Sequence, residues 1–264
     1  MIRSTTAELY RFLASRLWLW SLLAAVVLGG GFTAMFAFVG PENFDPPMPS
    51  LATGEGVLMM LGLTTLTLFV PALIGALAVT GEYRHRTIGH TFLTEPRRGR
   101  VLLAKLCALT VIGAGYAVTV SVMTLASLYG ATAAAGTELG ASLGHVLTAL
   151  AASSGAAVAY TLIGAGIGAL ARRQLVAVGV VMGWFAFGEI LTLALPGLNA
   201  AYPYLPGGAS AALTDFGYLA DTVAAETGRA TALLSPVAGL LVLLAYAGAA
   251  GVLAVATSLR RDVT

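Results

Sequence analysis

Charged residues are scarce in this chain. Only 10% of its 264 residues are Asp, Glu, Lys or Arg, whereas soluble domains carry about 25%. Hydrophobic residues make up 58% of the chain. This balance excludes a water-exposed globular domain and indicates a protein whose surface lies largely in a membrane.

Cysteine and histidine are also rare. The single cysteine, Cys107, excludes an intramolecular disulfide. His85 and His90 are five residues apart and do not share a helical face, so we expect no metal site there. A net charge of +2 gives no case for nucleic acid as a partner.

The chain lacks a phosphate-binding loop of the Walker type. Its only lysine is Lys105, and the residues before it lack the glycines of the GxxxxGK[ST] motif. We therefore expect a chain that is not itself an enzyme and binds no cofactor. Gly164, Gly166 and Gly168 resemble part of a dinucleotide fingerprint, but they lie in an apolar run with no strand before them, which favours close helix packing.

Long apolar runs make up most of the sequence. A bilayer core about 30 Å thick needs roughly 20 apolar residues in a helix. Stretches of that kind lie near 17–38, 57–80, 101–129, 143–170, 175–195 and 231–258. None shows the alternation of a membrane β-barrel. We expect an all-α integral membrane protein in which residues 1–264 form a single transmembrane domain of six helices. Pro71 and Pro236 predict kinks in the second and sixth of them.

Basic residues predict the orientation. All but one of the 14 Lys and Arg residues lie before the first span, between 81 and 105, at 172–173 or at 260–261. The loops on the opposite side hold Arg229 and most of the acids. By the positive-inside rule, both termini are predicted to be cytoplasmic.

Residues 1–16 predict an amphipathic interfacial helix before the first span. Leu9 and Phe12 lie on its apolar face, and Glu8 lies on the other. Thr5 and Glu8 have the spacing of a capping box, which predicts a helix N-terminus at Thr5. The pattern fits a simple membrane anchor as well as a contact with a partner.

The segment 81–100 reads GEYRHRTIGHTFLTEPRRGR. Glu82 and Arg86 stand at i and i+4 with the acid first, so the second helix is predicted to continue beyond the membrane. Thr94 is placed to cap a second short helix. Positive charge alone fits anchoring to lipid headgroups, but the ordered mixture of acid, aromatic, Arg and Thr favours a docking surface.

Glu189 is the one acid that falls well inside a span. A charge at the bilayer centre costs about 2.5 to 3.5 kcal/mol on insertion scales. Glu189 is therefore predicted either to line a translocation path or subunit contact, or to lie close enough to the outer interface to reach water. The apolar segment 196–230 that follows is predicted to pack on the outer membrane face, with a short helix over 209–221.

Taken together, these features resemble the permease subunits of ABC transporters of the ABC-2 type, with a type V exporter-like architecture. The most specific resemblance is an acidic-aromatic-basic run that ends in Thr-Ile and is followed by Pro-Arg-Arg. It is carried by Gly81, Glu82, Tyr83, Arg84, Arg86, Thr87, Ile88, Phe92, Leu93, Pro96, Arg97, Arg98, Arg100, Lys105 and Leu106. Tyr204, Leu205, Pro206 and Gly207 resemble a short motif of the last outer loop in actinobacterial-type members.

The resemblance implies a multi-pass subunit of a bacterial cytoplasmic membrane that pairs with a second copy or a homologous permease. A separate cytosolic ATPase subunit would hold ATP and Mg, and the complex would export or flip a hydrophobic or amphipathic substrate. The implied ATPase-coupling residues are Glu82, Tyr83, Arg84, Arg86 and Thr87, with supporting contacts from Leu9, Arg11 and Phe12 of the interfacial helix. Two alternatives remain: a non-transporting membrane scaffold that recruits a cytosolic partner, and a secondary transporter. No inverted repeat supports the latter.

Overall fold

The computed structural model describes residues 2–45, 47–84 and 98–253, which form helices and connecting turns without any β-strand. Among these residues, six helical stretches are long and apolar enough to cross a membrane. They are Leu17–Val39, Gly54–Arg84, Leu103–Ala135, Leu143–Ala171, Gln174–Ala194 and Pro236–Leu253. The prediction of an all-helical, multi-pass membrane protein is thus confirmed.

The spans are built from the following helices. The first consists of α2 (Leu17–Ala24), the π-helical turn η1 (Ala25–Gly31) and α3 (Phe32–Val39); the second of α4 (Gly54–Leu63), the 3-10 turn η3 (Thr64–Thr67) and α5 (Phe69–Arg84). The third and fourth are α7 (Arg98–Ala135) and α8 (Leu143–Ala171). The fifth consists of α9 (Gln174–Gly183), the π-helical turn η4 (Trp184–Gly188) and α10 (Glu189–Ala194), and the sixth is α13 (Pro236–Leu253).

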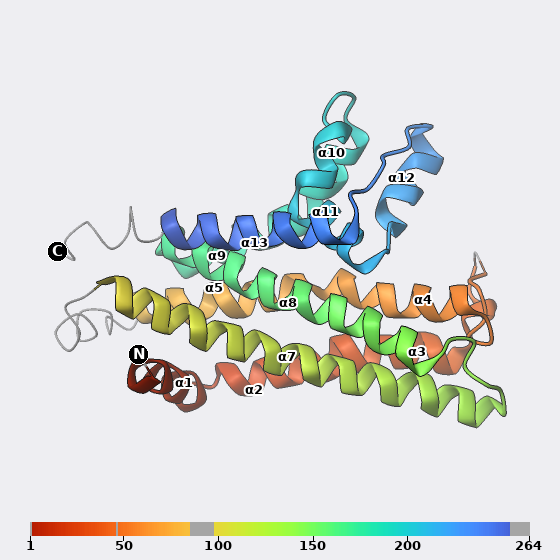
Figure 1. Cartoon of the computed structure of the whole chain (residues 1–264), viewed down its shortest axis with the longest axis horizontal. Helices are drawn as coiled ribbons and strands as arrows, with labels where there is room; N and C mark the ends of the chain where they lie inside the picture. Colours follow the sequence, from red (N-terminus) through yellow and green to blue (C-terminus); the bar gives the residue numbers. More distant parts are fainter. Residues whose placement is uncertain (1, 46, 85–97, 254–264) are drawn as a thin grey trace.

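The first four spans and α13 run along the long axis of the molecule (Figure 1). The surface helix α1 (Ile2–Ala14) lies at one end, against α7. The C-terminal ends of α5 and α13 and the turn between α8 and α9 lie at this same end. We call it the basic end, because it carries Arg11, Arg84, Arg172 and Arg173.

The α-helix of the second span is interrupted at Thr64–Thr67. The hydroxyls of Thr64, Thr65 and Thr67 each donate to a backbone carbonyl three residues earlier, at 2.6 to 2.7 Å. Pro71 has no N–H to donate to the carbonyl of Thr67, so α-helical hydrogen bonding is broken at the same place. A tighter 3-10 turn therefore separates α4 from α5.

Small residues bring the second and fourth spans together. A Cβ added at Gly164 would overlap the backbone carbonyl oxygen of Ala72, and one added at Gly168 would lie 2.6 Å from that of Ala76. Gly164 and Gly168 on the fourth span, like Ala72 and Ala76 on the second, stand four positions apart. This is the small-xxx-small spacing that lets helix backbones touch in membranes. Gly166 points elsewhere, against Ala250 of α13. The helix-packing interpretation of these glycines is confirmed.

Three local predictions were wrong. Helix α1 begins at Ile2, so Thr5 and Glu8 lie within it and do not cap it. Pro236 begins α13 and does not kink it, because a proline in the first turn has no intrahelical partner to lose; residues 231–235 therefore precede the span. In place of a single helix over 209–221, the structure has two.

The segment between the fifth and sixth spans is ordered into short helices. These are the 3-10 helix η5 (Asn199–Tyr204), α11 (Pro206–Thr214) and α12 (Tyr218–Thr227). Helix α11 is almost wholly buried and packs on α13, where a Cβ added at Gly239 would lie 2.5 Å from the carbonyl oxygen of Ala209. Figure 1 shows α10 and α12 projecting sideways from the bundle.

Candidate functional site

Ion pairs tie three helices together at the basic end. Lys105 of α7 donates to Glu82 of α5 and, at 3.2 Å, to Glu8 of α1. Arg11 also pairs with Glu8, at 3.0 Å. The side chains of Lys105, Glu8 and Glu82 are only 11 to 16% exposed. Burial strengthens attraction between opposite charges, so this network fixes α1 to the second and third spans.

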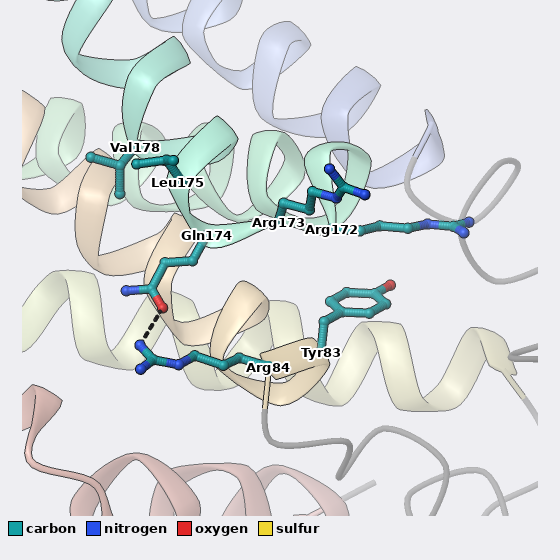
Figure 2. Close-up of a pocket in the computed structure, with 7 residues that line it drawn as sticks. All are labelled: Tyr83, Arg84, Arg172, Arg173, Gln174, Leu175 and Val178. Atoms are coloured by element: carbon teal, nitrogen blue, oxygen red, sulfur yellow. Dashed lines mark hydrogen bonds between the residues drawn. The ribbon is translucent and has the colours of Figure 1, made fainter.

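A second feature of the basic end is an open pocket of about 550 Å³. It lies where α5 ends and where the chain turns from α8 into α9 (Figure 2). Its lining residues are Tyr83, Arg84, Arg172, Arg173, Gln174, Leu175 and Val178. The Arg84 guanidinium donates to the side-chain oxygen of Gln174 at 3.0 Å, which ties the end of the second span to the start of the fifth.

Local backbone geometry places the pocket's arginines. Arg172 ends α8 in the left-handed region, with φ of 54°, and its N–H donates to the carbonyl of Gly168 at 3.0 Å. The chain then turns at Arg173 and enters α9 at Gln174. Left-handed backbone normally favours glycine. A turn of two residues between antiparallel helices thus sets two guanidinium groups beside the end of α5.

The predicted coupling residues divide between these two features. Glu82 lies in the ion-pair network, whereas Tyr83 and Arg84 line the pocket. Arg86 and Thr87 lie outside the described residues, as does the predicted cap at Thr94.

The interfacial-helix residues also differ in surroundings. Phe12 is half-buried and packs against the main hydrophobic core, and Leu9 is half-buried as well. Arg11 is exposed and pairs with Glu8. Leu9, Phe12 and Glu8 are therefore turned toward the bundle, whereas Arg11 lies at the surface.

Glu189 begins α10 in the fifth span, away from the basic end, and its side chain is buried. Only 7% of it is exposed. Its carboxyl lies against Gly207, where an added Cβ would overlap it, and near the hydroxyls of Tyr160 and Tyr202. Glu189 thus joins the fifth span to α8 and to the N-terminus of α11.

Three polar groups around Glu189 are buried without a hydrogen-bond partner among the described residues. They are Oε1 of Glu189, the indole Nε1 of Trp184 and the hydroxyl of Tyr160. Trp184 begins the π-helical turn that immediately precedes Glu189, and such turns are frequent at functional sites. Unpaired buried polar groups are uncommon in folded proteins, so this cluster is a second candidate region.

A small cavity lined by hydroxyls lies between the second, third and fourth spans. Its polar lining residues are Thr64, Thr65, Thr67, Tyr116, Ser121, Ser153 and Ser154. The space of about 20 Å³ fits one water molecule. The Tyr116 hydroxyl is buried there with no partner among the residues that the structure describes.

Sequence reasoning missed several members of these sites. Arg172 and Arg173 were interpreted only as orientation signals, and Gln174, Tyr160 and Trp184 were not singled out. One available signal was Lys105, a charge at the start of an apolar span that requires a buried partner. Lys105 pairs with both Glu8 and Glu82 because of the way α1 and α5 pack against α7. The spacing of residues along the chain does not specify that packing.

The candidate sites differ in the kinds of side chain that they bring together. In the described ranges, no three His, Cys, Asp or Glu side chains come close enough to hold a metal ion. Cationic groups gather at the basic end, and unpaired neutral and acidic groups gather around Glu189. Comparison with known proteins adds no assignment, because no family model and no curated protein sequence matches this chain.

Proposed function

We propose that the chain is the membrane-spanning permease subunit of an ABC-2 type ATP-binding cassette transporter. A separate cytosolic ATPase would bind at the basic end, and both termini would be cytoplasmic in a bacterial cell membrane. The complex would export or flip a hydrophobic or amphipathic substrate. ATP and Mg would be held by the ATPase subunit, since this sequence has no Walker A motif.

The observation that carries the proposal is the linkage around the end of α5. Glu82 is tied through Lys105 to α1 and α7, and Arg84 is tied through Gln174 to α9. A displacement of the segment that follows Arg84 would therefore be transmitted to the interfacial helix and to the third and fifth spans at the same time. That is the mechanical arrangement that a coupling segment requires.

A second copy or a homologous permease is the proposed membrane partner. In the most apolar window of each span, 17% of the fifth, 22% of the sixth and 28% of the first is buried inside the chain, against 67% of the second. These three spans therefore expose most of their apolar surface to lipid or to another subunit. The first and fifth of them are the proposed seam between two permease subunits, as the resemblance implies.

Co-purification tests the proposal directly. The tagged chain would be crosslinked in its native host and purified in mild detergent, and its partners would be identified and assayed for ATP hydrolysis. We expect a stoichiometric ATPase subunit with a phosphate-binding loop. A complex that survives extraction without such a subunit would overturn the proposal in favour of a scaffold, or of a secondary transporter if transport follows an ion gradient.

Charge reversal at Arg84 and Arg86 is expected to uncouple ATP hydrolysis from transport. The double variant Arg84→Glu/Arg86→Glu places negative charge on the proposed contact, so substrate movement per ATP hydrolysed should fall even where the ATPase is retained. The matched control is Arg229→Glu, because Arg229 lies in the segment between the fifth and sixth spans and is exposed. Normal coupling in the double variant would contradict the assignment of this segment.

Glu189→Gln is expected to alter transport and to leave assembly intact. The amide keeps the size of the side chain, so its packing against Gly207 is preserved, but the ability to carry a charge beside Tyr160 and Tyr202 is lost. Transport rate and complex recovery would be measured together. Glu226→Gln, at an exposed acid of α12, is the control. An unchanged transport rate would remove Glu189 from the proposed pathway.

A further inference from the structure

Hydroxyl groups gather at one place inside the membrane-spanning bundle. They line the small cavity between the second, third and fourth spans, and they come from the broken turn Thr64–Thr67, from Tyr116 and Ser121 of α7, and from Ser153 and Ser154 of α8. The other residues that line the cavity are apolar. The hydrocarbon core of a bilayer holds no bulk water, so polar groups at this depth need partners inside the protein.

Most of these hydroxyls have a partner within the chain. Those of Thr64, Thr65 and Thr67 donate to backbone carbonyls. The hydroxyls of Ser121 and Ser154 lie 3.4 Å apart, so one can donate to the other. A hydroxyl oxygen that already donates one hydrogen bond still has lone pairs that accept another. The cavity therefore offers several acceptors.

The Tyr116 hydroxyl is different. It is buried near the Thr67 hydroxyl, yet it has no hydrogen-bond partner among the residues that the structure describes. An unpaired buried hydroxyl is costly. The cavity beside it, of about 20 Å³, has room for one water molecule. A water molecule there would accept from Tyr116 and donate to neighbouring hydroxyl oxygens, which gives it the two to four polar partners that buried water has.

The cavity borders the break in the second span, and different neighbours hold the two sides of that break. In α5, a Cβ added at Gly75 would overlap the carbonyl oxygen of Thr161 in α8. In α4, a Cβ added at Gly62 would overlap the ring of Phe216, which lies between α11 and α12. Two rigid helices packed against different neighbours move relative to each other at the break between them.

We propose that the cavity binds one structural water molecule and that, with this water, Thr64–Thr67 form a hinge in the second span. The water accepts a hydrogen bond from Tyr116 and donates to hydroxyl oxygens of the lining. Ordered water and Ser or Thr side chains satisfy the groups that a helix break sets free in a membrane, and water at such a break allows a helix to bend. The site does not depend on the proposed transport function.

Hydroxyl-radical labelling of the purified full chain tests the water site. A short X-ray pulse splits water into radicals that modify adjacent side chains, and mass spectrometry locates the modified residues. Leu68 lines the cavity and Leu109 does not, although both are buried, at 4 and 3% exposed. We expect Leu68 to be modified several times faster than Leu109. Equal rates in the wild-type chain would overturn the proposal.

A matched pair of variants tests the role of Tyr116. Tyr116→Phe and Tyr129→Phe each remove one hydroxyl from α7, and Tyr129 is exposed and does not line the cavity. We expect only Tyr116→Phe to slow the labelling of Leu68, because the water loses its donor. Labelling at the wild-type rate in Tyr116→Phe would contradict the site. The wild-type comparison of Leu68 with Leu109 decides the question even if a variant does not fold.

A sodium ion is the other occupant that oxygen ligands and this volume fit. Thermal unfolding would be measured in detergent with sodium chloride and with choline chloride at equal concentration. We expect the same unfolding temperature in both, because bound water does not depend on sodium. A higher unfolding temperature in sodium that Tyr116→Phe abolishes would identify a cation site and overturn the water proposal.

Spin-label distances test the hinge. One pair of labels would be placed at Leu58 of α4 and Leu170 of α8, and the control pair at Leu147 and Leu170, which share α8; all three positions are exposed. We expect a broader distance distribution for the pair that crosses the break. We expect Pro71→Ala to narrow it, because alanine restores an N–H for the carbonyl of Thr67. Equal widths for the two pairs in the wild-type chain would contradict the hinge.

Discussion

Replacement of Lys105 by methionine is expected to release α1 from the bundle and to destabilise the protein by about 3 to 5 kcal/mol. Lys105 is the common partner of Glu8 and Glu82. The side chains of Glu8 and Glu82 are only 11 and 13% exposed. Without the lysine, their two negative charges would lose the cation that they share. Thermal unfolding in detergent and tryptic cleavage after Arg16 would measure the loss of stability and the release of α1.

Two variants control this prediction. Lys105→Met/Glu82→Gln removes one of the two negative charges along with the lysine, so part of the lost stability should return. Arg11→Met breaks a pair whose arginine is 43% exposed, and exposed pairs contribute about 0 to 1 kcal/mol. If Lys105→Met unfolds at the wild-type temperature and α1 stays protected from trypsin, the network does not hold α1 in place.

The substitution Gly164→Val is expected to cost about 3 kcal/mol, at the upper end of the range for overpacked cores. A Cβ at Gly164 overlaps the backbone carbonyl oxygen of Ala72, and a backbone atom cannot rotate aside as a side chain can. The second and fourth spans would have to separate. Their separation should also disturb the neighbouring contact of Gly75 with the carbonyl oxygen of Thr161.

Gly155 provides the matched control on the same helix. No atom lies within 4 Å of the position that its Cβ would occupy. Gly155→Val should therefore leave the unfolding temperature close to that of the wild type, since valine and glycine differ by only a few tenths of a kcal/mol in helix propensity. Equal unfolding temperatures for the Gly155 and Gly164 variants would show that the two spans are not in close backbone contact.

The candidate sites differ in how far the sequence predicted them. Glu82, Tyr83 and Arg84 were singled out because an ordered charge pattern follows an apolar span. Their division between an ion-pair network and a pocket was not predictable. Arg84 bonds to Gln174, a residue 90 positions away, and no local pattern specifies which helix lies beside the end of α5.

Glu189 shows the same limit. Its position inside an apolar run was enough to mark it as unusual, because a charge in hydrocarbon is costly. The structure shows that its side chain is buried, with only 7% exposed. The reason is that α11 folds back and presses Gly207 against the carboxyl, and this return of the chain is not visible in the spacing of residues 196–230.

The sequence by itself determined that this is an all-helical, multi-pass membrane protein with six spans. Hydrocarbon thickness sets how many consecutive apolar residues a helix needs, so the number of spans is a local property of the chain. Only the tertiary structure decided which charges neutralise one another, which arginines share a pocket and which glycines meet a backbone. Those outcomes depend on contacts between helices far apart in the sequence, where the packing of small residues and the burial of charge select one arrangement.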